Sequence, residues 1–239
     1  MNLLTDSFEF GLHTQIHFGV DRIQELPSII KKNNYQKILV CTDKGIVDSG
    51  TLDRLESVLK SGEVNYELFT EVEPDPTFRV VKKVEELFIM KNCDALIGLG
   101  GGSSIDTAKG VSVAVANPGD LSLFEGKNQI PNRGPDIIAI PTTAGTGSEV
   151  THATVLKDEK RKYKMGIVSE HLHPKVAILD PRLLTTLPKG SSAITGMDAL
   201  SHAIESYTSN QAQPITEALG LHAIELIGKW LRPFVADRS

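Results

Sequence analysis

The sequence predicts an α/β fold in which a doubly wound parallel sheet is followed by the start of an all-helical domain. From Tyr35 onward, short β-branched runs alternate with amphipathic stretches, and the runs are apolar throughout. Such strands are covered on both faces, because right-handed crossovers place helices on each side of a parallel sheet. After Gly190 the pattern is helical only. We therefore expect residues 1–189 to form a dinucleotide-binding α/β domain and residues 190–239 to form the first helices of an incomplete all-α domain.

The expected elements follow the order of the chain. HTQIHFG predicts an edge strand, and a helix is expected from Ile23 to Lys32. The core strands are predicted in KILVCT, NYELF, ALIGLG, DIIAIP and KVAILD, and the helices between them in TLDRLESVLKSG, PTFRVVKKVEELFIMKN and SIDTAKGVSVAVAN. The polar segment THATVLKDEKRKYKMGIV predicts a small β insertion.

Two further helices are expected in SSAITGMDALSHAIESYTS and PITEALGLHAIELIGKWLRPFVA. The second carries an apolar face too wide for a surface helix, around Trp230 and Phe234. We expect further protein to cover this face, and therefore a homo-oligomer.

Composition excludes several classes of function. The chain has 239 residues and a formal net charge of -5 without a long basic run, so a nucleic-acid partner is not expected. No apolar run approaches the length of a membrane span, and no secretory signal opens the chain, so we expect a cytoplasmic protein without a membrane partner. Cys41 and Cys93 form no CxxC pair and are predicted to be core thiols.

The motif GLGGGSSIDTAKG predicts a phosphate or nucleotide site. Its glycines let the backbone approach a phosphate, and the N–H groups at the start of the following helix, at the positive end of the helix dipole, hold an anion. It lacks the GK[ST] of a Walker loop and differs from GxGxxG. The alternative is a strand-to-helix turn capped by Ser103 or Ser104, which three consecutive glycines make less favoured.

A second loop, AIPTTAGTGSEVT, also leaves a strand, and its hydroxyls can bind phosphate, ribose or a nicotinamide carboxamide. Two such loops at strand ends define one crevice. At the end of KILVCT, Asp43 can accept both hydroxyls of an adenosine ribose and would repel a 2′-phosphate, which favours NAD over NADP. Taken alone, Asp43 is better explained as a helix N-cap or turn residue.

In TGMDALSHAIES, Asp198 and His202 are four residues apart and share one face of a helix. They can therefore chelate one divalent metal. On spacing alone, a capping or helix-surface hydrogen bond is the more frequent explanation, and His202 could equally be a core imidazole with its hydrogen bonds satisfied. We interpret His171 and His173 as surface residues, because no carboxylate or thiol partner is evident.

Taken together, GGGSSIDTAKG, PTTAGTGSEVT, AILDPRLLTTLP and TGMDALSHAIESY resemble the iron-containing (group III, metal-activated) alcohol dehydrogenases, with lactaldehyde and propanediol oxidoreductases among the nearest types. The resemblance implies a Rossmann-like, dehydroquinate synthase-like domain facing a helical domain, with NAD and a divalent metal, Fe²⁺ or alternatively Zn²⁺, in the cleft. It assigns metal binding to Asp198 and His202. It assigns cofactor binding to Asp43, Asp75, Gly101, Gly102, Ser103, Thr142, Thr143, Thr146 and Lys164.

This family completes its metal site with two further histidines downstream. His222 is the only histidine after His202, and it fits neither position. We therefore expect the chain to be truncated within the helical domain and its own activity to be low, and we assign no catalytic side chain.

The resemblance implies an oxidoreductase that interconverts a primary alcohol and an aldehyde, or a secondary alcohol and a ketone, with metal-assisted hydride transfer to or from NAD. Its small-molecule partner is the alcohol or aldehyde. One alternative is an NAD-binding module without turnover, which cofactor binding without product formation would favour. The other is a glycerol dehydrogenase-like polyol oxidoreductase, which a substrate panel would distinguish.

Overall fold

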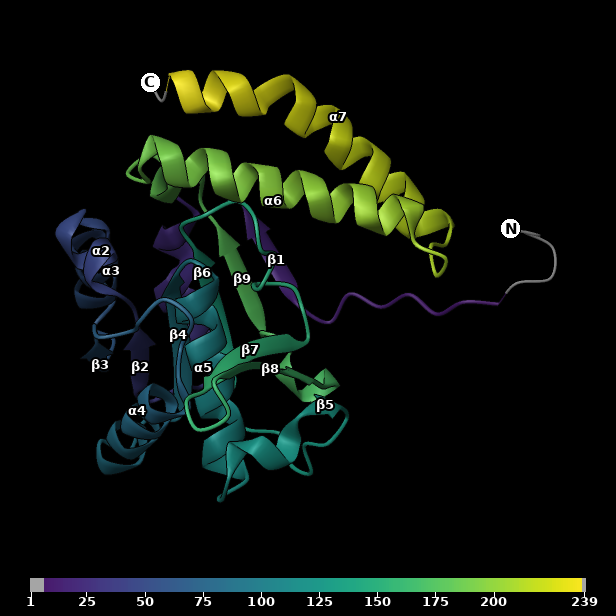
Figure 1. Ribbon diagram of the computed structural model, residues 1–239. Helices are drawn as coiled ribbons and strands as arrows, with labels where there is room; N and C mark the ends of the chain where they lie inside the picture. Colours follow the sequence, from purple (N-terminus) through teal and green to yellow (C-terminus); the bar gives the residue numbers. More distant parts are fainter. Residues whose placement is uncertain (1–6, 238–239) are drawn as a thin grey trace. The chain divides into compact units, whose positions relative to one another are not determined.

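In the computed structural model, residues 7–237 are described, and they divide into two compact units (Figure 1). The α/β unit consists of Thr14–Thr143 and Gly147–Thr186. The helical unit contains the described residues up to His13, the short segment Ala144–Thr146, and the described residues from Leu187 onward.

The α/β unit is built on a six-stranded sheet in the order β1-β9-β6-β4-β2-β3, and every neighbouring pair is parallel. This confirms the predicted doubly wound parallel sheet. The central strands are buried along their whole length, which explains their uninterrupted apolar sequence. The strands are β1 (Gln15–Phe18), β2 (Ile38–Cys41), β3 (Tyr66–Phe69), β4 (Ala95–Gly100), β6 (Asp136–Pro141) and β9 (Val176–Leu179).

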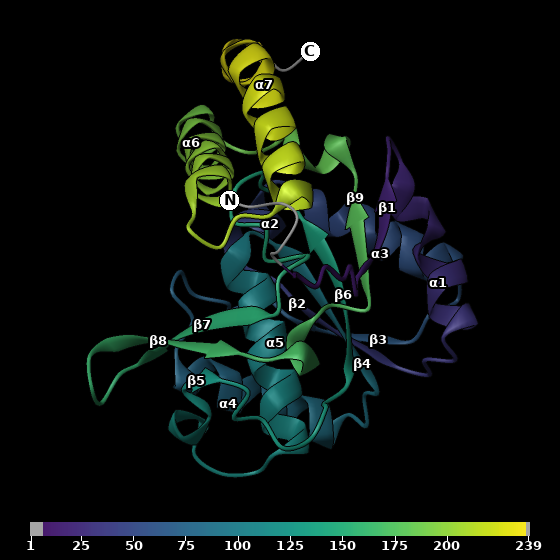
Figure 2. The same ribbon diagram turned by 90° about the vertical axis from the view of Figure 1, so that its right-hand side faces the viewer.

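Helices cover both faces of this sheet (Figure 2). Side chains alternate along each strand, so Leu39 and Cys41 of β2 enter the core under α4 (Phe78–Met90) and α5 (Gly102–Ala116). Ile38 and Val40 enter the opposite core. That core lies under the 3-10 helix η1 (Arg22–Glu25), α1 (Leu26–Lys32) and α3 (Thr51–Ser61).

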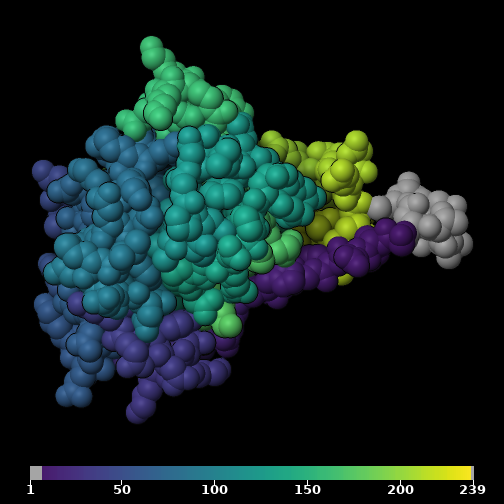
Figure 3. Space-filling model, turned by 90° about the horizontal axis from the view of Figure 1, so that it is seen from below, coloured from purple at the N-terminus to yellow at the C-terminus, as the bar shows by residue number. Residues whose placement is uncertain are grey.

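The connection from β6 to β9 contains the predicted β insertion. Strands β7 (Ala153–Asp158) and β8 (Tyr163–Val168) form an antiparallel hairpin, and β5 (Gly126–Lys127) pairs with β8. The tip of the hairpin projects from the α/β unit and is the green protrusion in Figure 3. Four further short helices are α2 (Lys44–Asp48), η2 (Leu121–Phe124), η3 (Glu170–Leu172) and η4 (Pro181–Leu184).

The helical unit contains α6 (Lys189–Thr208) and α7 (Pro214–Ala236), which pack along one another. A capping box begins α7, and Gly196 of α6 lies against Leu231. Trp230 is 55% exposed, so the apolar face predicted for the last helix lies open in this structure. None of the described helices is long and apolar enough to span a bilayer.

Candidate functional site

The candidate cofactor site lies where the order of the sheet reverses. From β2 the chain moves outward to β3, whereas β6, β9 and β1 lie beyond β4, on the other side of β2. The crevice between the carboxyl ends of β2 and β4 is therefore the topological switch point, the usual ligand site of an open α/β sheet. Asp43 follows β2 and Gly101 follows β4, so the structure brings both predicted residues to this crevice.

Asp43 is fixed in the crevice by two hydrogen bonds. Its Oδ1 accepts the backbone N–H of Ile46, 3.2 Å away, so Asp43 is the N-cap of α2. Its Oδ2 accepts the hydroxyl of Ser104, 3.3 Å away, from the first turn of α5. The N-cap explanation considered for Asp43 thus holds, and the same side chain also lies beside the glycine loop.

The glycines at the carboxyl end of β4 and directly after it form a cradle without side chains. Gly100 has a φ of 143°, which side chains disfavour, and a Cβ there would lie 2.5 Å from Ser104 Oγ. Gly101 is extended, and a Cβ there would lie 3.4 Å from Thr143 Cγ2. No side chain caps α5. The Ser104 N–H donates to Gly101 O, whereas helix geometry leaves the N–H groups of Gly102 and Ser103 without a partner inside the helix. The cradle therefore suits a phosphate group.

The second loop begins directly beside this cradle. The Thr142 N–H donates to Gly100 O over 3.0 Å, and Thr142 is buried. Thr143 faces Gly101 at the distance given above. Thr146 belongs to the segment grouped with the helical unit and is exposed. The structure thus brings Thr142 and Thr143 to the glycine cradle.

Asp75 and Lys164, both predicted to contact the cofactor, form an ion pair with each other, with 2.7 Å between Asp75 Oδ1 and Lys164 Nζ. Both side chains are more than half exposed. The hairpin strand β7 lies beside the same loop, because the Lys157 N–H donates to Pro76 O over 2.8 Å. The sequence did not predict this pairing, since 89 residues separate the two charges.

A buried charged cluster on α5 was not predicted from the sequence. Lys109 has 0% exposure, and its Nζ donates to the carbonyl oxygens of Thr151 and Ala153. Burial lowers the pKa of Lys109 to about 8, against the opposing effect of Asp106 and Glu149. Burial likewise raises the pKa of Asp106, which Lys109 partly offsets. The sequence did contain one indication of this cluster, because Asp106 and Lys109 lie three residues apart in a helix that otherwise consists of apolar and small residues.

The predicted metal ligands lie on α6 in the helical unit. His202 Nε2 is 3.8 Å from Asp198 Oδ1, and the two side chains are 51% and 44% exposed. Their carboxylate oxygen and imidazole nitrogen are suitable donors for iron or zinc. Among residues 7–237, the pair belongs to no cluster of three or more such donors within ligating distance, so it offers two ligands.

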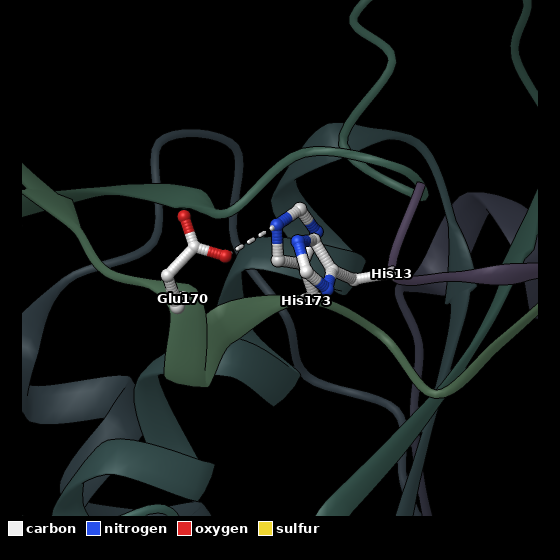
Figure 4. Close-up of side chains that lie close together, drawn as sticks. All are labelled: His13, Glu170 and His173. Atoms are coloured by element: carbon white, nitrogen blue, oxygen red, sulfur yellow. Dashed lines mark ion pairs between the residues drawn. The ribbon is translucent and has the colours of Figure 1, made fainter. Parts of the chain in front are cut away.

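The interpretation of His173 as a surface residue without a carboxylate partner is wrong. Its side chain is 12% exposed, and its Nε2 lies 3.3 Å from Glu170 Oε2 (Figure 4). The reason is local, because Ser169 caps η3 and the resulting turn brings positions three apart onto one side. His171 is partly exposed.

Two family profiles match the chain in sequence order. Residues 13–181 match the iron-containing alcohol dehydrogenase profile. Residues 192–239 match the C-terminal profile of the Fe-containing alcohol dehydrogenase family.

Individual relatives agree with these profiles. A choline dehydrogenase of Bacillus subtilis is 38% identical over 99% of this chain and 61% of its own length. An NAD-dependent methanol dehydrogenase of Bacillus methanolicus is 37% identical over 92% of this chain and 58% of its own. The solved structure of a sulfoacetaldehyde reductase from Bifidobacterium kashiwanohense, in complex with NAD⁺, has a TM-score of 0.91 and 34% identity, covering 97% of this chain and 61% of that one. The chain thus spans about 60% of the length of these relatives.

Proposed function

The chain belongs to the iron-containing alcohol dehydrogenase family, and from this premise we propose that it carries the NAD-binding part of an oxidoreductase that interconverts an alcohol and an aldehyde or ketone. The observation that carries the proposal is the glycine cradle beside Asp43 at the switch point of the sheet. An NAD-dependent relative and an NAD⁺ complex among the similar structures support the same cofactor.

The residues of the cradle fit a dinucleotide. Gly101, Gly102 and Ser103 would bind the pyrophosphate through backbone N–H groups, because side chains are absent where the phosphates must approach. Asp43 would accept the ribose hydroxyls, since its carboxylate has acceptor capacity left beyond its two present donors. Its negative charge opposes the 2′-phosphate of NADP.

The other proposed cofactor residues surround this cradle. Thr142 and Thr143 would bind the cofactor from the second loop, and Thr146 would contribute a hydroxyl from the same loop. Asp75 and Lys164 would contact the cofactor, and these new contacts would replace part of the ion pair between the two side chains. When bound, NAD supplies the hydride acceptor or donor at its nicotinamide ring.

We assign metal binding to Asp198 and His202, with iron as the expected ion and zinc as the alternative. When held there, a divalent ion would supply Lewis-acid chemistry at the alcohol or carbonyl oxygen of the substrate. Asp198 and His202 would supply two ligands, and other groups would have to fill the remaining coordination positions of the ion.

Further assignments follow from the family. The small-molecule partner would be an alcohol or aldehyde, the division near residues 189 and 190 would separate the cofactor domain from the helical one, and the protein would act in the cytoplasm. The exposed apolar face of α7 favours a homo-oligomer.

Calorimetric titration of the chain with NAD⁺ and NADP⁺, followed by an assay of short primary alcohols and polyols with ferrous ion or zinc, tests the proposal. We expect NAD⁺ to bind more tightly than NADP⁺. Absence of NAD⁺ binding would overturn the proposal. Binding without NADH formation would favour a module that holds NAD without turnover, and a preference for glycerol would favour a polyol oxidoreductase.

A further inference from the structure

We propose that Asp106 and Lys109 form an internal clamp that positions the second cofactor loop against α5, the helix whose first turn forms the phosphate cradle. Neither side chain would touch the cofactor, so both would be positioning residues. The inference rests on the proposed NAD site, because it states how one half of that site is held in place.

Asp106 holds the chain as it returns from the second loop. Its Oδ1 accepts the hydroxyl of Ser148 and its Oδ2 accepts the N–H of Val155, each over 3.0 Å. Its backbone carbonyl accepts the hydroxyl of Thr154, also over 3.0 Å. One residue of α5 therefore contacts both ends of the stretch from residue 148 to residue 155.

Lys109 holds the middle of the same stretch. Its Nζ donates to Ala153 O over 2.8 Å, to Thr151 O over 2.9 Å and to Thr151 Oγ1 over 3.2 Å. An ammonium group can donate three hydrogen bonds, and these three acceptors use all of them. Together, Asp106 and Lys109 join residues 148–155 to α5 by six hydrogen bonds.

Burying the ammonium group of Lys109 costs free energy unless each of its N–H groups donates a hydrogen bond. Lys109 has 0% exposure, and its neighbours Ala108 and Val111 belong to the apolar core. Removing an ammonium from water is unfavourable, and an apolar side chain of similar length would avoid that penalty. A charged group that reaches backbone carbonyls of the neighbouring chain instead fixes one position for that chain. This favours positioning of the loop over core filling as the role of Lys109.

The two ends of the second loop are thus attached to the same β4–α5 unit. The start of the loop is held by the hydrogen bond from the Thr142 N–H to Gly100 O. The segment that leaves the loop, residues 148–155, is held by Asp106 and Lys109. Thr143 lies in this loop, facing Gly101 across the cradle. Loss of the hydrogen bonds to residues 148–155 would lengthen the unrestrained part of the loop. Cofactor binding would then have to order that part again, at a cost in conformational entropy.

The test compares Lys109→Met, which keeps the length of the side chain but removes its donors, with Ile29→Ala. Ile29 is buried in the opposite core, so its truncation destabilises the fold without touching the clamp. Ser148→Ala removes the hydrogen bond from the Ser148 hydroxyl to Asp106 and serves as the milder variant if Lys109→Met does not fold. Each folded protein is titrated with NAD⁺ well below its unfolding temperature. Amide hydrogen exchange is measured without ligand.

We expect Lys109→Met to raise the Kd for NAD⁺ by about tenfold and Ser148→Ala by about threefold, while Ile29→Ala leaves it unchanged. Exchange should accelerate in residues 148–155 of both clamp variants and not in Ile29→Ala. An unchanged Kd in Lys109→Met or Ser148→Ala, or an equal rise in Ile29→Ala, would overturn the clamp and leave the proposed function standing. A wild-type chain that fails to bind NAD⁺ would overturn the proposed function, and the clamp with it.

Discussion

Helix α5 belongs to the α/β unit and helix α7 to the helical unit, and the two differ in the fraction of their residues that is buried. Ten of the fifteen residues of α5 are buried, whereas Gly220 is the buried residue among the twenty-three of α7. The candidate residues follow the same contrast. Asp43 is held by two hydrogen bonds within the α/β unit, while the side chains of Asp198 and His202 on α6 are about half exposed and 3.8 Å apart. The proposed NAD site is thus preorganised by the packing of the α/β unit, whereas the proposed metal ligands are not held in this way.

The largest expected effect comes from Gly101→Val. The backbone at Gly101 is extended and tolerates valine, so the variant should fold. Its side chain would fill the cradle, and we expect NAD⁺ affinity to fall by about a hundredfold or more, equivalent to ~3 kcal/mol. Calorimetry measures the affinity, and circular dichroism checks the fold. Unimpaired NAD⁺ binding would reduce the loop to a structural turn and remove the contrast between the two units.

The buried charge on α5 predicts that the stability of the fold depends on pH. The pKa of Lys109 is lowered to about 8 from its ordinary 10.5, so above pH 8 the unfolded chain binds a proton that the folded chain has released. The free energy of unfolding of the wild type, minus that of Lys109→Met, should therefore rise by about 2 kcal/mol between pH ~7.5 and ~9.5.

Urea denaturation of both chains at several pH values measures this difference. Groups that do not interact with Lys109 cancel in the subtraction, including the Cys41 thiol, whose raised pKa acts in the opposite direction. A difference that is flat across this range would mean that Lys109 keeps an ordinary pKa in the folded protein.

A smaller effect is expected for Asp43→Gly. Loss of the carboxylate removes the acceptor for the ribose and the repulsion of a 2′-phosphate, so the ratio of NADP⁺ to NAD⁺ affinity should rise by about tenfold. Part of any loss in stability will come from the missing N-cap of α2, about 1 kcal/mol. Asp43→Ser separates the two roles, because serine can still cap the helix. If the wild type binds both nucleotides equally, Asp43 does not select the cofactor.

The smallest expected effect concerns metal. With two exposed ligands, iron or zinc should leave the chain on dialysis, and His202→Ala should abolish the residual binding. NAD⁺ affinity should change less than about twofold in His202→Ala, because the proposed NAD site is organised independently. Elemental analysis and NAD⁺ titration measure the two quantities. Stoichiometric metal after dialysis would show that another group completes the site.

The sequence predicted the parts of the α/β unit in which one local rule dominates. Continuous apolar runs such as those ending at Cys41 and Gly100 identify buried parallel strands, and the triple glycine identifies the turn after β4. It missed α2, which has five residues and depends on the Asp43 cap, and β5, which has two residues and exists through pairing with β8. Such short elements carry no periodicity of their own.

The candidate site shows the same division. Asp43 and the glycine cradle were predicted because strand ends converge at a sheet edge. The clamp and the Asp75–Lys164 ion pair were not predicted, because each joins residues about 40 to 90 positions apart through loops of irregular path. The spacing of residues in the sequence determines which side chains meet within one helix. It does not indicate which distant loop packs against that helix.

The burial of both cysteines has a practical consequence for the measurement of motion. Burial raises the pKa of Cys41 to about 12 and that of Cys93 to about 11, so neither should react with maleimides near neutral pH. A cysteine introduced in place of Lys162, at the exposed tip of the β7–β8 hairpin, would then be the single reactive thiol. A fluorophore or spin label attached there would follow the hairpin as nucleotide is added, without prior removal of the native cysteines.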